Sequence, residues 1–496
     1  MVWGNSDNQA AVDGWIHRLR TNDPHFVSLH IMAARRLTTD QFAQLFAALA
    51  HNHTLTQLYC SGHAQSDASL TALADALSQY NHTLQSLTLG DPQLVAHASN
   101  GVQALCTAIG INKSLQLLDW SHCGLGTAED EAVAGRLGQS LENMLARSSS
   151  LSEVVLSHNA LDDTMVKHVV AGVRANGIAQ GALTSLDLSY NELGPDAITS
   201  LASALVPAIA RTPKHGLHEL NLAGNPGMGV AGMAQLGCTL ARPESTCRKI
   251  VLSDCHAATT TTTTDDADAE TGTKRATMGD AFLAALSETS SDVSAATLDL
   301  EEIKLDRCAV TVAGARHLAQ LLGRPGNRLC EMTLRGNALG DEGARQLAVP
   351  IVPLPDAAQG HTITASITGI SLDLSENAIT DDGLAALLVS DASSIAQLIL
   401  YGNQIALSEA FVKRVAAAWT SPQAALTLLD LSGNKIDTAG FERLADALIA
   451  GALPRLCKLE LAGNVDVTKD EAAKTAWRDI AARITDARPQ LVLLWC

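Results

Sequence analysis

Aromatic residues are scarce in this sequence, since Phe, Trp and Tyr make up only 3% of 496 residues. Rings therefore cannot supply most of a core, and with 47% hydrophobic residues that task falls to Leu, Ala, Val and Ile. Basic residues are also few, with 34 Lys and Arg against 52 Asp and Glu, so the formal net charge is −18. Such a chain repels nucleic-acid backbones and anionic membranes, which leaves basic protein surfaces as the favoured partners.

Motifs for a metal, a nucleotide or secretion are missing as well. The ten cysteines contain no Cys-x-x-Cys pair and no Cys/His cluster at zinc spacing. There is no G-x-x-x-x-G-K-[ST] loop, no Ser/His/Asp set with a shared context, no signal peptide and no run of 18 apolar residues. We therefore expect no enzyme activity, no cofactor and no metal. We also expect a cytoplasmic, reducing location, because unpaired cysteines persist there.

What the sequence does contain is a repeat. L-T-S-L-D-L-S-Y-N-E-L begins at Leu183, L-C-E-M-T-L-R-G-N-A-L at Leu329 and L-T-L-L-D-L-S-G-N-K-I at Leu426. All three follow the leucine-rich-repeat pattern L-x-x-L-x-L-x-x-N/C-x-L. About fifteen such turns follow one another at spacings of roughly 30 residues, so the chain is predicted to be one repeat array.

The length of each turn predicts what it contains. About 30 residues give room for a strand, a loop, a helix of three turns and a second loop. In the first turn, Phe42, Leu45, Phe46 and Leu49 fall at i, i+3, i+4 and i+7, on one face of a helix. We therefore predict an α/β solenoid shaped as a horseshoe, with a curved parallel sheet on the concave face and helices on the convex face.

Two further positions recur in the turns. From the fourth turn onward an Asn or Cys follows the apolar triplet, whereas the first three turns have Ala34, His63 and Pro92 there; a buried Asn can pair with the backbone of the neighbouring turn. Six residues later a glycine recurs, which fits a close approach where the loop enters the helix. The Asn positions are Asn159, Asn191, Asn225, Asn337, Asn377, Asn403, Asn434 and Asn464, the Cys positions are Cys123, Cys255 and Cys308, and the glycines are Gly314, Gly343, Gly383 and Gly440.

The complete pattern L-x-L-x-x-N-x-[LI]-x-x-x-G-x-x-x-L occurs over 332–347, with Met332 at the first leucine position. It resembles the ribonuclease-inhibitor-like subfamily of leucine-rich repeats, and the resemblance extends over nearly all of the chain. That subfamily includes enzyme inhibitors, sensor domains of immune receptors, a GTPase-activating protein and flagellar axoneme components. The resemblance thus implies the fold and a protein-binding role, without singling out one partner.

We expect four segments along the chain. Residues 1–24 form an N-terminal capping helix, and 25–256 form the first half of the repeats. Residues 257–277, rich in Thr and Asp, form a flexible insertion. The second half of the repeats and a C-terminal cap occupy 278–496.

The concave face is the predicted binding surface. Side chains alternate along a strand, so the residues between the buried leucines point into the hollow. Nine acids and four bases (Lys249, Lys304, Arg335 and Lys458) fall at such positions, which predicts a negative surface for docking a basic protein; the alternative is that Asp in L-D-L-S is simply part of the repeat and aids solubility. With Tyr401 as an aromatic anchor, the predicted partner-binding residues are Asp119, Glu153, Asp187, Glu219, Glu302, Glu331, Asp373, Tyr401, Asp430 and Glu460.

Three other patterns are interpreted structurally. The G-x-G-x-x-G match over 227–232 coincides with an ordinary repeat turn. The sequons at Asn52, Asn81 and Asn112 all precede the first Leu of a turn, so we assign them to the chain returning to the strand. The histidines are scattered, and those at strand ends do not form an unbroken ladder, so no metal site is expected.

The sequence thus predicts a non-catalytic scaffold that binds protein, within which a structural role in a large assembly such as an axoneme is one possibility. Two alternatives stay open: a GTPase-activating protein of the nuclear-transport type, and a sensor or inhibitor domain that binds a basic protein.

Overall fold

The computed structural model describes residues 5–179, 181–206, 216–256, 276–288, 298–324, 327–348, 369–389, 395–419, 425–464 and 471–495. Within these ranges, fifteen strands alternate with fifteen α-helices. The chain forms two compact units, unit 1 (Met1–Gly232 with Glu244–Arg248) and unit 2 (Met233–Pro243 with Lys249–Cys496). The Thr/Asp-rich insertion expected at 257–277 lies almost entirely outside the described residues.

Unit 1 contains a parallel sheet in which each strand pairs with the next strand along the chain. Its strands are β1 (Ser28–His30), β2 (Gln57–Ser61), β3 (Ser86–Gly90), β4 (Leu117–Asp119), β5 (Glu153–Val155), β6 (Ser185–Asp187) and β7 (Glu219–Asn221). Its helices are α1 (Asn5–Arg20), α2 (Thr39–Leu49), α3 (Asp67–Gln79), α4 (Leu94–Ile111), α5 (Glu131–Arg147), α6 (Asp163–Ile178) and α7 (Pro195–Leu205). The 3₁₀ helices η1 (Ala33–Arg35) and η2 (Pro226–Met228) also lie in this unit, and the boundary falls within α8 (Gly229–Leu240).

Unit 2 repeats the same arrangement, with parallel pairs in chain order. Its strands are β8 (Lys249–Val251), β9 (Glu302–Lys304), β10 (Glu331–Thr333), β11 (Ile370–Asp373), β12 (Ile395–Ile399), β13 (Leu428–Asp430), β14 (Lys458–Glu460) and β15 (Val492–Leu494). Its helices are α9 (Met278–Ser287), α10 (Val312–Leu322), α11 (Gly340–Leu347), α12 (Asp381–Val389), α13 (Glu409–Trp419), α14 (Thr438–Ile449) and α15 (Glu471–Ala487).

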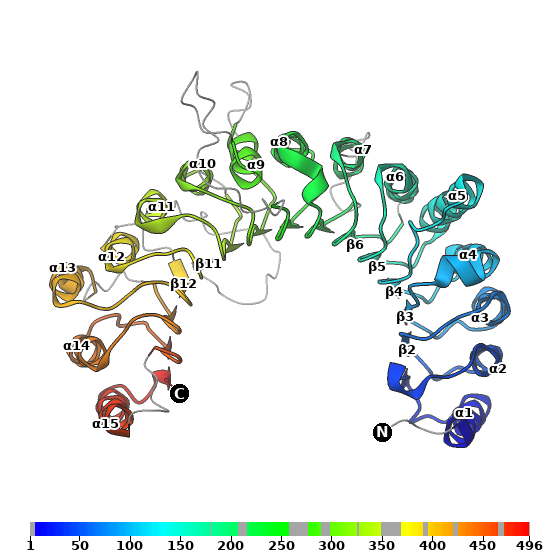
Figure 1. Cartoon of the computed structure of the whole chain (residues 1–496), viewed down its shortest axis with the longest axis horizontal. Coiled ribbons are helices and arrows are strands. Elements are labelled where there is room, and N and C mark those ends of the chain that lie inside the picture. The colour runs from blue at the N-terminus through cyan, green and yellow to red at the C-terminus, as the bar shows by residue number, and fades with distance from the viewer. Residues whose placement is uncertain are drawn as a thin grey trace, which may run out of the picture. The chain divides into compact units, whose positions relative to one another are not determined.

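In each unit the helices form the outer layer and the strands form the inner layer (Figure 1). The core lies between them. The apolar face predicted for α2 is the one that packs inward, since all four of its predicted residues are at most 1% exposed. Strand residues such as Leu118 and Leu186, together with Trp120, fill the other side of the core. Each turn thus consists of an inner strand followed by an outer helix, and the turns follow one another along the chain. This is the predicted leucine-rich-repeat solenoid.

The recurring Asn holds neighbouring turns together. The Asn159 side chain donates from Nδ2 to the carbonyl of Trp120 at 2.8 Å, and its Oδ1 accepts the backbone N–H groups of Cys123 (2.9 Å) and Leu125 (3.2 Å). Where cysteine replaces Asn, it keeps the donor: Cys308 Sγ lies 2.9 Å from the carbonyl of Leu252 in the preceding turn. The role predicted for this position is therefore correct, because buried backbone groups at the end of each strand need partners.

Two of the four recurring glycines, Gly314 and Gly383, have a specific partner in the preceding turn. Asp341 Oδ1 accepts the backbone N–H groups of Thr380 (2.7 Å) and Gly383 (3.0 Å), where α12 begins. A Cβ on Gly383 would lie 2.6 Å from that oxygen, so only glycine allows the approach. Carboxylates at the starts of other helices accept bonds from the following turn in the same way; these are Asp67, Asp163, Asp280 and Asp381.

The three sequons form a second ladder of asparagines, inside the returning turns. Asn81 is fully buried and donates from Nδ2 to the carbonyls of Leu49 and Asn52, both at 3.0 Å. Its Oδ1 accepts the N–H of Leu84 at 3.0 Å. Asn112 bonds in the same manner to the turn before it. These amides are already used within the fold, so the structural interpretation of the sequons is confirmed.

Helix α4 has the length and apolar composition of a membrane span, although no run of 18 apolar residues was found in the sequence. It packs between α3 and α5 as one layer of the solenoid, and 56% of it is buried. Buried core helices commonly have this composition, so α4 is an ordinary helix of the array.

Candidate protein-binding face

The exposed strand positions of unit 1 carry four carboxylates, Asp119, Glu153, Asp187 and Glu219, which we call the acidic quartet. In β4, β5 and β6 the central residue is buried and both flanking residues are partly exposed. Because the strands are in register, these flanking residues form two columns across the sheet. Glu153 and Glu219 lie in the first column, two strands apart, and Asp119 and Asp187 lie in the second, also two strands apart. The quartet thus alternates between the columns from β4 to β7.

The quartet behaves as a cluster of like charges. The pKa of Glu153 is raised, first by partial burial and then by the charges of Glu219, Asp119 and Asp187. Hydrogen bonds to neutral groups support part of the cluster: Asp187 accepts the Ser189 N–H at 2.8 Å. Among the ion pairs within the described ranges, none involves a member of the quartet. Its negative charge is therefore left uncompensated within unit 1.

The corresponding strand positions of unit 2 are compensated by bases. Glu302 lies 3.1 Å from Lys249 Nζ and 2.8 Å from Lys304 Nζ, and Lys304 also reaches Glu331 at 3.7 Å. Burial alone would raise the pKa of Glu302, but the two lysines outweigh it and hold that pKa below its ordinary value. The predicted acids on β9 and β10 are thus engaged by neighbours in their own sheet.

The other predicted acids of unit 2 also have partners within the fold. Glu460 pairs with Lys458 at 2.7 Å. Asp373 is deeply placed, so burial raises its pKa even though the N–H and hydroxyl of Ser375 donate to it. Asp430 accepts the N–H of Ser432 at 2.8 Å.

Tyr401 does not belong to the strand face itself, because it follows the end of β12. Tyr401 is 43% exposed, and its ring lies 5.5 Å from the guanidinium of Arg335, which in turn pairs with Glu376 at 2.5 Å. The ten predicted residues are therefore not one uniform surface: four form an uncompensated cluster in unit 1, and the others lie among partners in unit 2.

A row of three stacked rings, His122, His158 and Tyr190, runs beside the quartet, and we call it the aromatic ladder. The rings of His122 and His158 lie 4.2 Å apart and 12° from parallel, and those of His158 and Tyr190 lie 4.5 Å apart and 5° from parallel. All three residues have φ between 53° and 55°. The stack continues onto Gly224, where a Cβ would come within 2.3 Å of the Tyr190 ring. Glycine thus leaves room for the last ring.

The sequence interpretation missed this ladder because it treated the histidines as scattered. His63 is indeed apart from it: its side chain is buried against Phe42, and burial lowers its pKa. The signal was present, however, since His122, His158 and Tyr190 each stand directly before the Cys or Asn of three consecutive turns. Aligning the turns on that Cys or Asn places the three rings side by side.

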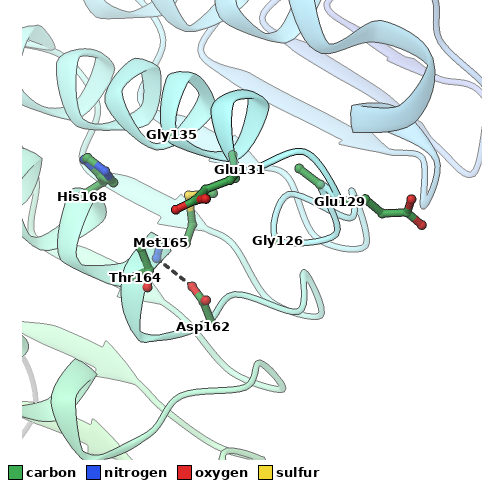
Figure 2. A pocket seen from close by; sticks show the side chains of 10 residues that line it. Gly126, Glu129, Glu131, Gly135, Asp162, Thr164, Met165 and His168 are labelled. Atoms are coloured by element: carbon green, nitrogen blue, oxygen red, sulfur yellow. Dashed lines mark hydrogen bonds between the residues drawn. The ribbon is translucent and has the colours of Figure 1, made fainter.

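A hollow of about 500 Å³ lies on the helical side, at the starts of α5 and α6 (Figure 2). Its polar groups are used within the fold: Asp162 accepts the Met165 N–H at 2.8 Å, and His168 lies 2.8 Å from Glu142. The acids beside it, Glu129 and Glu131, do not form a metal-binding group, and none was found in the residues that the structure describes. We assign this hollow to the gap between two turns.

The fold and its face define a leucine-rich-repeat protein. A family model described as "Leucine Rich repeat" matches residues 183–202, 370–388 and 425–445. The chain has distant homology to ribonuclease inhibitors: it is 28% identical over 331 residues to the ribonuclease inhibitor of Sus scrofa, covering 62% of this chain and 63% of that protein. It is 26% identical over 329 residues to the NACHT, LRR and PYD domains-containing protein 12 of Mus musculus, covering 61% of this chain and 30% of that protein.

The chain therefore spans less than two thirds of the length of either relative. Among solved structures, the crystal structure of the yeast Rad7 and Elc1 complex contains a chain with 15% identity and a TM-score of 0.44, covering 98% of this chain and 93% of that one.

Proposed function

We propose that this protein is a non-catalytic scaffold that holds a basic protein partner against the inner face of unit 1. The acidic quartet carries the proposal. Four carboxylates that repel one another are unfavourable in the free protein, and a cationic partner relieves that repulsion on binding. Retaining such a cluster with no ion pair to any of its four carboxylates in the described ranges is most readily explained by a partner that supplies the cations.

The partner is a protein with a basic surface, and neither nucleic acid nor an anionic membrane fits the charge of the chain. A reducing, cytoplasmic location suits it, because Cys60, Cys106, Cys123 and Cys308 are buried free thiols. The relatives reported above lend no support to an axonemal or cytoskeletal role or to GTPase activation, so neither is part of the proposal.

A second candidate is that the scaffold acts as an inhibitor, by covering a functional site of the partner. The similarity to the pig ribonuclease inhibitor favours this candidate. An inhibitor would use the same face and the same charges as a scaffold. The two candidates differ only in whether binding abolishes the activity of the partner.

The test uses the full chain as bait in an extract of the native cell, at low and at high salt. A partner bound through the quartet is recovered in stoichiometric amount at low salt and released at high salt. The quartet-amide variant carries Asp119→Asn, Glu153→Gln, Asp187→Asn and Glu219→Gln, and it is expected to lose the partner.

A matched control removes four acids from unit 2 instead, with Glu302→Gln, Glu331→Gln, Asp430→Asn and Glu460→Gln. This control is expected to retain the partner. Equal recovery by the quartet-amide variant and the unchanged chain, with both folded by circular dichroism, would show that the inner face of unit 1 is not the binding surface.

A further inference from the structure

We infer that the segment of the partner that lies on unit 1 is a basic α-helix that crosses β4–β7, with cationic residues at positions i, i+3, i+7 and i+10. This inference rests on the proposed function and specifies the shape of the partner. It depends on the order of charged and uncharged residues on the sheet face and on the aromatic ladder beside that face.

The exposed residues of β4–β7 form two columns across the sheet, and the four carboxylates of the quartet alternate between these columns from one strand to the next. From β4 to β7 the first column reads Leu117, Glu153, Ser185 and Glu219, and the second reads Asp119, Val155, Asp187 and Asn221. Each strand therefore offers one carboxylate and one uncharged residue. Neighbouring strands lie about 4.8 Å apart, so successive carboxylates advance by about 4.8, 9.6 and 14.4 Å while they alternate between the two columns.

An α-helix laid across the strands reproduces this zigzag. At about 1.5 Å per residue, positions i+3, i+7 and i+10 advance by about 4.5, 10.5 and 15 Å, each within about 1 Å of a carboxylate. At about 100° per residue these positions fall alternately on two ridges about 60° apart, as the two columns require. Cations at these four positions would each meet one carboxylate.

An extended segment does not fit as well. Its side chains on one face repeat about every 6.6 Å, whereas the carboxylates within one column repeat about every 9.6 Å. Each column contains one such step, and over it the second cation would fall about 3 Å short of its carboxylate. The spacing of the quartet thus favours a helical partner over a strand.

The aromatic ladder supplies a flank for that helix and is an observation separate from the charges. Its rings occupy the turns of β4, β5 and β6, three of the four strands that carry the quartet. Because both faces of the His158 ring are covered by its neighbours, its exposed parts are the ring edges, and Tyr190 at the end of the stack is 44% exposed. A fixed row of edges gives the aliphatic stems of lysine and arginine an apolar surface to pack against without ordering any mobile side chain.

The test uses three synthetic peptides of 18 residues with one composition and four arginines each, bound to the full chain and followed by fluorescence anisotropy. The matched peptide carries arginine at i, i+3, i+7 and i+10. The permuted peptide carries the same four arginines spread around the helix, and the third has the matched order with a central D-residue pair that prevents helix formation. We expect the matched peptide to bind at least ten-fold more tightly than either of the others.

Two variants separate this inference from the proposed function. The quartet-amide variant is expected to lose the preference for the matched peptide together with most of the binding. A variant with His158→Gly and Tyr190→Gly, which removes two rings and keeps the quartet, is expected to weaken the matched peptide several-fold.

If all three peptides bind the unchanged chain equally and all are lost with the quartet-amide variant, the helical inference is wrong and the proposed function stands. If the disrupted peptide binds most tightly, the partner is extended and the inference is again wrong. Binding that survives in the quartet-amide variant would overturn both, because the cations would then be held elsewhere.

Discussion

His158 shows at the scale of one residue how a turn accepts an unfavourable backbone. Its φ of 55° lies in the left-handed region, where a side chain other than glycine costs about 1 kcal/mol. Its ring is stacked on both sides, by His122 and by Tyr190, and at about 0.5 kcal/mol for each such exposed pair the two contribute about 1 kcal/mol together. The two effects are of similar size, so the position tolerates a histidine that glycine occupies in other turns.

Replacing His158 by glycine and by alanine separates these two effects. Glycine loses the stack and relieves the backbone, so we expect His158→Gly to change the free energy of unfolding by less than about 0.5 kcal/mol. Alanine loses the stack and keeps the strain, so His158→Ala should be less stable by about 1 kcal/mol. Urea denaturation followed by circular dichroism measures both.

Ala160 provides the control, because it has φ of 53° in the same loop and no ring to lose. Ala160→Gly should therefore be slightly stabilising. A glycine variant at 158 that is less stable than the alanine variant would contradict this account of the ladder.

At the scale of the element, the contacts at the starts of the helices were only partly predictable from the sequence. The recurring glycine indicated a close approach, and Gly314 and Gly383 do meet the carboxylate of an aspartate from the preceding turn. The sequence could not identify that aspartate, because Asp280 and Asp341 lie in the preceding turns, about 30 to 40 residues away. Only the stacking of turns brings the two together, so the link between helices is a property of the fold and not of one repeat.

Asp381 makes this link sensitive to pH. It accepts the backbone N–H groups of Ala406 (2.9 Å), Leu407 (2.9 Å) and Ser408 (2.7 Å), before α13 begins. Burial raises the pKa of Asp381, but these bonds and one from the Ser408 hydroxyl outweigh it, so the pKa is lowered overall. A lowered pKa means that the stabilisation is present above the ordinary aspartate value and is lost as the pH falls through the lowered one.

We therefore expect amide hydrogen exchange at 406–408 to accelerate as the pH is lowered below about 4, after correction for the intrinsic rate. In Asp381→Asn, the change with pH should disappear because the amide does not titrate. Exchange at these amides that depends on pH in the same way in both proteins would rule out this carboxylate as the cause.

Across the whole molecule, the fold was predictable because apolar residues repeat with one period from end to end. The pairing of the charged residues was less predictable. The sequence gives nine acids and four bases at exposed strand positions, but it does not show which of them meet. Register decides that: it places Lys249 beside Glu302 in unit 2, whereas the corresponding neighbours of Glu153 in unit 1 are Leu117 and Ser185.

Unit 1 should therefore gain stability when a quartet charge is removed, at the expense of binding. The pKa of Glu153 is raised by burial and by its acidic neighbours, so its contribution to stability is full below the ordinary glutamate value and is lost as the pH rises through the raised one. At neutral pH, Glu153→Gln is expected to raise the free energy of unfolding by about 0.5 kcal/mol, because most of the repulsion is screened by solvent. It should weaken a basic partner about five-fold.

Glu331→Gln in unit 2 is the matched control, since it removes one carboxylate that Lys304 contacts. It should lower stability slightly and leave the affinity for the basic partner unchanged, because that carboxylate is already compensated. Both differences should shrink as ionic strength rises from about 0.05 to 0.5 M, since screening weakens exposed charges. The two variants, Glu153→Gln and Glu331→Gln, should therefore change the free energy of unfolding in opposite directions, because the strands give the two carboxylates different neighbours. If both variants changed the free energy of unfolding in the same direction, the quartet would carry no excess repulsion, and the reason for assigning the partner to unit 1 would be lost.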